Sequence, residues 1–250
     1  MTASLQKLRT ELNAAMSTAG AGLPAANELC VACVDLVGVD GAAISMVYDG
    51  FSHGTFGSSS EMSRRLDEHQ FTFGEGPCLD AAAEGKAVLV PDLNSPDEQR
   101  WPGFAGAALG EGIHAVFAMP IRLSSACVGA LDLFREAPGP LTADQMAGGM
   151  LVAELASLPL MDLMASKTVN PAETSEGKQR QVVDLDRIEV YQATGMLMSQ
   201  LDVGPAEALV RLRAHAISTD QTASEVAWAI VERRLVLERD DRGHNEKRPR

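Results

Sequence analysis

The sequence predicts an α+β domain with a largely antiparallel sheet, followed by a separate all-α unit of three short helices. Its 250 residues are enough for two ordinary domains. Between residues 42 and 134, short apolar runs bounded by turn residues alternate with helical segments, as in α+β folds. Between residues 187 and 238, apolar residues recur at three- and four-residue steps in three successive stretches, which is the period of amphipathic helices.

A helix is expected near the start of the chain, within residues 1–20. Leu5, Leu8 and Leu12 lie on one face of it and form a narrow apolar stripe. The stripe favours packing on a partner helix in a homodimer over the alternative, a lid on the same domain. A second helix is expected to follow Leu23-Pro24 and to end near Gly38.

The second helix contains a C-x-x-C motif, Cys30 and Cys33. One interpretation is a redox pair or half of a metal site. The other is a buried helix face, because free cysteine behaves as a small hydrophobic residue. We favour the buried face, since no second C-x-x-C motif or histidine cluster completes a zinc site.

A sheet and its covering helices are expected to follow. Asp49-Gly50 predicts a hairpin turn. The long helix that starts at the capping box Thr142–Gln145 should kink or end at Pro159. The other segments are predicted as strands at 42–48, 51–56, 70–73, 87–90, 113–120 and 126–134, and as helices at 59–68, from 77, and at 99–110.

Six segments of the first domain, residues 23–165, match the pattern of one family of domains: Asp49-Gly50, Gly74–Cys78, Val90–Leu93, Arg100–Pro102, Met119–Ile121 and Val128–Leu131. Through these segments the domain resembles the GAF family of sensory domains. The resemblance implies a GAF-like antiparallel sheet flanked by helices. The N-K-x-F-D-E run of cyclic-nucleotide-binding GAF domains is missing, so cAMP and cGMP lose support as ligands.

A ligand pocket is predicted between the sheet and its helices, for a small-molecule or protein signal that the sequence does not name. No cofactor is identified and no metal site is expected. An arginine beside an aromatic ring suits an anionic or planar ligand, although Trp101 and Phe104 could instead only close the core. The candidate lining residues are Phe73, Cys78, Arg100, Trp101, Phe104 and His114.

Cys78 follows Gly76-Pro77 at a predicted helix start. The helix dipole and free N–H groups there would lower the pKa of the thiol and favour the thiolate. A redox-sensor or covalent-ligand role is one interpretation. The other, which we favour, is a cysteine buried between the helix and the sheet.

The second domain, residues 182–238, is expected to be a unit of three helices. Gly204-Pro205 predicts the start of its second helix, and Thr222–Glu225 has the form of a capping box. Its family pattern is carried by Arg187-Ile188, Gln192–Met198, Glu207-Ala208, Leu212-Arg213, Ala216 and Glu225–Ala227.

Through these residues the unit resembles the ANTAR family, small RNA-binding modules that promote transcription antitermination. The first domain most closely resembles the bacterial GAF domains that precede such modules. Two positions depart from the family pattern: Thr194 stands where a lysine is common, and Leu209 where an aromatic residue is common.

The distribution of charge makes the second domain the better candidate for binding nucleic acid, because the first domain is strongly acidic. Of the net charge of −13, residues 1–165 carry 8 basic and 20 acidic residues (−12), and residues 166–250 carry 13 and 14 (−1). Arginine pairs with phosphates and stacks on bases, and splayed bases of hairpin loops suit a small positive face. The ANTAR resemblance favours an RNA-binding role for these groups, whereas the residue pattern alone favours a solvated helix face for the arginines. The predicted RNA-binding residues are Arg187, Tyr191, Arg211, Arg213, His215, Arg233 and Arg234, with Trp228 as a further stacking or helix-packing group.

The sequence thus predicts a signal-responsive, non-enzymatic regulator that binds tandem hairpins in a transcript leader and promotes antitermination. Residues 166–181 read as a linker and residues 239–250 as a charged tail. The sequence has no continuous apolar run of about 18 residues and no signal-peptide pattern, so a cytoplasmic protein without a membrane partner is expected. Two alternatives stay open: a cysteine-based GAF enzyme like free methionine sulfoxide reductase, using Cys78 or Cys127, and a DNA-binding helix-turn-helix regulator.

Overall fold

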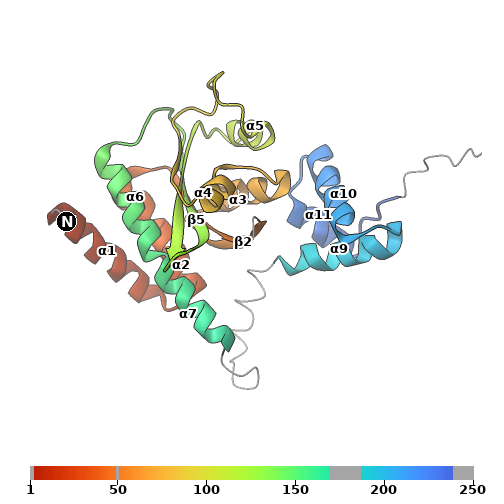
Figure 1. Ribbon diagram of the computed structural model, residues 1–250, viewed down its shortest axis with the longest axis horizontal. Helices are drawn as coiled ribbons and strands as arrows, with labels where there is room; N and C mark the ends of the chain where they lie inside the picture. The colour runs from red at the N-terminus through yellow and green to blue at the C-terminus, as the bar shows by residue number, and fades with distance from the viewer. Residues whose placement is uncertain (1–2, 49–50, 169–186, 239–250) are drawn as a thin grey trace, which may run out of the picture. The chain divides into compact units, whose positions relative to one another are not determined.

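The computed structural model describes residues 3–48, 51–168 and 187–238, which form two compact units, residues 1–188 and 189–250 (Figure 1). Each unit is described by itself. The predicted linker at 166–181 lies almost entirely outside the described residues. The turn at 49–50 and the tail at 239–250 lie outside them entirely.

A five-stranded antiparallel sheet forms the centre of the first unit. Its strand order is β2-β1-β5-β4-β3, and every neighbouring pair is antiparallel. The α+β prediction is therefore confirmed, because helices cover both faces of this sheet (Figure 1). The strands are β1 (Gly41–Tyr48), β2 (Phe51–Ser58), β3 (Val88–Val90), β4 (Ala115–Leu123) and β5 (Ala126–Arg135).

One face of the sheet is apolar and packs on three helices: α2 (Leu23–Cys33), α6 (Ala143–Leu155) and α7 (Ser157–Thr168). The first helix, α1 (Ala3–Ala19), packs on α2 and α6 and extends the same apolar layer. A single π-helical turn, η1 (Val34–Gly38), continues α2. Leu12 of α1 is buried in this layer, so part of its apolar stripe is satisfied within the chain, and dimerisation through α1 stays a prediction.

Cys30 and Cys33 lie in the same apolar layer, and both are fully buried. Burial raises the pKa of the Cys33 thiol to about 12, and that of Cys30 also lies well above its ordinary value. The interpretation of this C-x-x-C motif as a buried helix face is confirmed.

The helix after residue 142 begins as predicted, with both hydrogen bonds of the Thr142–Gln145 capping box present. The predicted break near Pro159 is present: α6 ends at Leu155, four residues before the proline, and α7 begins at Ser157. Pro159 itself lies in the first turn of α7, where its missing N–H costs little. The helical stretch Ala143–Leu163 is long enough and apolar enough on average to cross a membrane. The sequence prediction missed it because it searched for an unbroken run of apolar residues. However, 56% of its most apolar window is buried within the unit, as in a core helix of a globular domain.

The opposite face of the sheet is covered by α3 (Glu61–Phe73), α4 (Pro77–Glu84) and α5 (Pro102–Gly110). The strand predicted at 70–73 is wrong, because α3 continues through these residues. The Ser60 side chain caps its start, and Gly74, with a left-handed φ of 69°, ends it. Four residues are too few to distinguish the period of a strand from that of a helix.

The three helices of the second unit are α9 (Ile188–Leu201), α10 (Pro205–Ser218) and α11 (Ala223–Val231). The capping box at Thr222 and Glu225 is present. The third helix ends seven residues earlier than its pattern predicts. Arg233 takes a left-handed φ of 59°, and the Gln200 amide donates a 2.6 Å hydrogen bond to the Leu237 carbonyl, so the chain turns back toward α9.

Candidate functional site

A cluster of fully buried polar side chains lies between the sheet and α3 and α4. We call it the buried polar cluster; its members are Ser45, Asp67, Gln70, Cys78 and Asp132. They come from β1, α3, α4 and β5, and apolar side chains of the same layer surround them. Buried polar groups persist only where they are hydrogen-bonded, paired or bound to a ligand.

Asp67 accepts two hydrogen bonds from strand hydroxyls. The Ser45 hydroxyl donates to Oδ1, and the Thr55 hydroxyl donates to Oδ2. Ser45 and Thr55 face each other in the β1–β2 ladder, and a register shift separates Ile44 from Ser45. Such irregularities re-aim side chains, and here two neighbouring hydroxyls converge on one carboxylate.

Arg187 joins this cluster from a distant part of the sequence. Its Nη2 lies 3.4 Å from Asp67 Oδ2, its Nη1 forms an ion pair with Glu68, and its guanidinium lies 4.1 Å from the centre of the Phe71 ring. Arg187 was expected to contact RNA, but only 4% of its side chain is exposed, and it lies within the first unit. In the sequence, the adjacent acidic residues Asp67 and Glu68 indicate that a basic partner is needed. Their spacing does not identify Arg187 as that partner, because it lies 120 residues from Asp67.

Gln70 links Asp132 to the start of α4. Its Nε2 donates to Asp132 Oδ2 at 2.5 Å, and its Oε1 accepts from the Cys78 backbone N–H at 2.8 Å. Gly76 makes this link possible: it has a φ of 145°, and an added Cβ would lie 2.4 Å from Gln70 Oε1.

Burial controls the protonation of the cluster. It raises the pKa of Asp132 well above the ordinary range, and the nearby Asp67 carboxylate adds to this effect. Burial also raises the pKa of Asp67, although Arg187 and the two hydroxyls oppose it. The pKa of the Cys78 thiol is raised well above its ordinary value by burial and by both carboxylates. The expected lowering at the helix start is therefore wrong, because desolvation and negative neighbours outweigh the helix dipole.

The other predicted pocket residues lie in or beside the same layer. Trp101 and Phe104 are buried in it, as the core-closing alternative holds, and the Trp101 indole donates to Asp80 at 3.1 Å. Arg100 lies over the Trp101 ring at 4.1 Å and forms an ion pair with Glu98 at 2.5 Å. Phe73 and His114 are half-buried.

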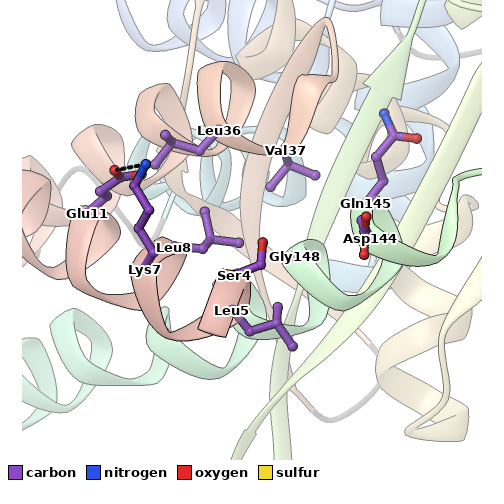
Figure 2. A pocket seen from close by; sticks show the side chains of 10 residues that line it. All are labelled: Ser4, Leu5, Lys7, Leu8, Glu11, Leu36, Val37, Asp144, Gln145 and Gly148. Carbon is purple, nitrogen blue, oxygen red and sulfur yellow. Dashed lines mark ion pairs between the residues drawn. The ribbon is translucent and has the colours of Figure 1, made fainter. Parts of the chain in front are cut away.

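A hollow of about 260 Å³ lies among α1, η1 and α6 (Figure 2). These elements belong to the helical layer on the other side of the sheet from the buried polar cluster. Leu5 and Leu8 of α1, Val37 of η1 and Gly148 of α6 contribute apolar walls, and a Lys7–Glu11 ion pair lies at one rim. None of the predicted pocket residues lines it.

The second unit has its own hollow of about 370 Å³, lined in part by Arg211 and His215 of α10 and by Leu237. Arg211 also holds an ion pair with Glu207 at 2.8 Å. Tyr191 and Trp228 expose more than half of their surface, so Trp228 does not serve mainly in helix packing. Arg213 is half-buried, and Arg233 and Arg234 are exposed.

Comparison with protein families identifies both units. The GAF domain model matches residues 24–160, and the ANTAR domain model matches residues 181–231. The chain belongs to the GAF domain family. It has the GAF–ANTAR architecture, in which a sensory domain precedes an RNA-binding module. No curated protein matches the chain.

Solved GAF domains share the fold at low sequence identity. That of a phosphoenolpyruvate-protein phosphotransferase from Coxiella burnetii is 14% identical with a TM-score of 0.53, covering 67% of this chain and 100% of its own. Its Acinetobacter counterpart is 11% identical with a TM-score of 0.51, covering 68% and 99%. A free methionine-R-sulfoxide reductase from Neisseria meningitidis is 16% identical, and the match covers 68% of this chain and 96% of the reductase. Its TM-score of 0.46 is too low to support a shared activity.

Proposed function

We propose that this protein binds RNA hairpins in nascent transcripts through its ANTAR domain and so promotes transcription antitermination under the control of its GAF domain. The observation that carries the proposal is the ANTAR match over residues 181–231. A hairpin held by the protein would disfavour formation of a terminator. This action takes place in the cytoplasm, where transcripts are made.

The RNA-binding face is proposed from side chains of the second unit that reach solvent. Tyr191 and Trp228 offer exposed rings on which splayed bases can stack. Arg211 and His215 line one hollow, and Arg233 and Arg234 lie just beyond α11. Since the domain is nearly neutral overall, placed arginines and stacking contribute more than net charge.

Arg187 is the residue through which the GAF domain can influence the RNA-binding module. It directly precedes α9 in the chain, and Asp67 and Glu68 hold its guanidinium within the first unit. A signal that changes the charge of Asp67 would change this hold. A ligand shifts such an equilibrium only by its difference in affinity for the two states.

Neither alternative gains support from the site. A cysteine-based reductase needs an accessible thiolate, whereas the Cys78 thiol is fully buried and its pKa is raised. Cys127, the other candidate nucleophile, is half-buried on β5, and its thiol donates a hydrogen bond to the Gly129 carbonyl. A helix-turn-helix regulator needs base-reading groups on a recognition helix. The start of α11 instead uses Thr222 and Glu225 in its own capping box.

The test is RNA binding by the full chain, with a tandem-hairpin leader RNA, the single-stranded DNA of the same sequence and a duplex DNA across a salt series. Selective binding of the hairpin RNA is expected. Arg211→Ala and Arg213→Ala should each weaken it and reduce the salt slope by about one. The matched control is Arg122→Ala in the GAF domain, where the guanidinium donates to the Gly85 carbonyl at 2.7 Å.

Read-through of a terminator in transcription with purified polymerase gives the functional measurement. Wild-type protein should increase read-through, and the variants that lose RNA affinity should lose this effect in proportion. Equal affinity for all three nucleic acids, with no response to either α10 substitution, would contradict the proposal.

A further inference from the structure

Three potential metal ligands meet within the buried polar cluster. One ligand atom each from Asp67, Cys78 and Asp132 lies within 4.8 Å of the other two, and all three side chains are fully buried. They belong to α3, α4 and β5, so the packing of three separate elements brings them together. In a tetrahedral zinc site, ligand atoms about 2.0–2.3 Å from the ion lie about 3.3–3.8 Å apart. Each pair of ligand atoms would therefore have to approach by no more than about 1.5 Å to form the site.

Asp132 supplies the independent indication of a ligand. Its Oδ2 accepts from Gln70, but its Oδ1 has no hydrogen-bond partner among the described residues and no contact with solvent. An unpaired carboxylate oxygen in a protein interior is costly. This oxygen belongs to the same carboxyl group that approaches Asp67 and Cys78, where a cation would satisfy it.

The charges of the cluster point to a divalent ion. With all three donors deprotonated, Asp67, Cys78 and Asp132 carry −3, and the buried guanidinium of Arg187 returns one charge, leaving −2. Glu68, which holds the other side of Arg187, is partly exposed and is stabilised by solvent as well. A divalent cation therefore neutralises the fully buried groups, which removes most of the cost of burying them as ions.

We propose that Asp67, Cys78 and Asp132 bind one divalent transition-metal ion of the zinc type, which would give the GAF domain a resident cofactor. One thiolate and two carboxylates suit such an ion better than Mg²⁺ or Ca²⁺, which prefer oxygen ligands alone. Ser45 and Thr55 hold the Asp67 carboxylate, and Gln70 holds that of Asp132, as outer partners orient the ligands of known metal sites. On binding, the protons of the thiol and of any protonated carboxyl group leave to solvent.

The proposal stands apart from RNA binding, and it is tested on the full chain without RNA. The protein is stripped with a chelator, kept reduced with a phosphine, and titrated with Co²⁺ and then Zn²⁺. One equivalent of Co²⁺ should bind with a thiolate-to-cobalt charge-transfer band, and Zn²⁺ should displace it. Cys78→Ser should abolish the band. Asp132→Asn should weaken metal binding by at least about 10–100-fold, the loss seen even for outer partners.

Cys127→Ser is the matched thiol control, because Cys127 lies on the same strand as Asp132 but outside the cluster, and it should leave the titration unchanged. Circular dichroism checks that each variant is folded. X-ray absorption of the zinc-loaded wild-type chain needs no variant and should show one sulfur ligand per zinc. Absence of binding by the folded chain, two sulfur ligands (as Cys30 and Cys33 would give), or a cobalt band that persists in Cys78→Ser would each overturn the proposal.

Discussion

Replacing Arg187 by alanine tests whether the buried ion pair forms in solution. The substitution leaves the Asp67 carboxyl without its cation in a site that excludes water. Removing one partner of a buried pair typically costs about 3–5 kcal/mol. The guanidinium also lies over the Phe71 ring, a contact that adds about 1 kcal/mol. Because Asp67 can take up a proton and so limit the loss, we expect the lower end, about 3 kcal/mol near neutral pH.

The loss should depend on pH. The folded pKa of Asp67 is already raised, and without Arg187 it rises further. Between the unfolded and folded pKa values the native state binds more protons, so stability falls as pH rises through this window. Arg187→Ala should therefore be more damaging at pH 8 than at pH 5.

Urea unfolding of the GAF domain gives the measurement, followed by Trp101 fluorescence in a Trp228→Phe background, since the chain has only these two tryptophans. Arg65→Ala is the control. Arg65 is 45% exposed and pairs with Glu111 on the surface at 2.9 Å, an interaction worth less than about 1 kcal/mol. If the two substitutions destabilise equally, Arg187 does not occupy the buried site.

Three further predictions concern individual positions. In the metal-free protein, the free energy of unfolding should fall as pH rises above the ordinary carboxyl range, because the folded pKa of Asp132 is raised. Urea unfolding at several pH values should show a smaller fall for Asp132→Asn, and the same pH dependence in both proteins would refute the raised pKa of Asp132. Thr222→Ala removes the capping box of α11 and should cost the ANTAR domain about 1 kcal/mol, read from Trp228 fluorescence on heating. Gly129→Ala places a Cβ 2.2 Å from the Ser45 carbonyl oxygen and should cost about 2–3 kcal/mol of stability. Gly106→Ala, where an added Cβ meets nothing within 4 Å, should be neutral or stabilising by about 0.5–1 kcal/mol. Similar denaturation midpoints for the two variants would contradict the close packing of β1 on β5 at Gly129.

The fold was largely predictable because its signals are local. Short apolar runs bounded by turn residues predicted all five strands of the sheet. The capping boxes at Thr142 and Thr222 predicted two helix starts. What failed was also local. The pattern at 70–73 was too short to distinguish the period of a strand from that of a helix. The end of α11 was missed because Arg233 takes a left-handed φ, which an arginine gives no reason to predict.

The buried polar cluster was not predictable because its members are far apart in the chain. Ser45 and Asp67 are 22 residues apart, Gln70 and Asp132 are 62 apart, and Asp67 and Arg187 are 120 apart. Each looks like an ordinary polar residue in its own segment. Only the strand order and the placement of α3 bring them together, and one sequence contains no record of those pairings.

Strand β1 belongs to two different interiors at once. Ile44 and Met46 point into the apolar layer of α1, α2 and α6, whereas Ser45, between them, points into the buried polar cluster. Alternate residues of a strand face opposite sides, so the two interiors share a wall but not their side chains. The chemistry on one side can therefore diverge during evolution by substitutions at alternate positions, while the helical layer on the other side keeps its packing.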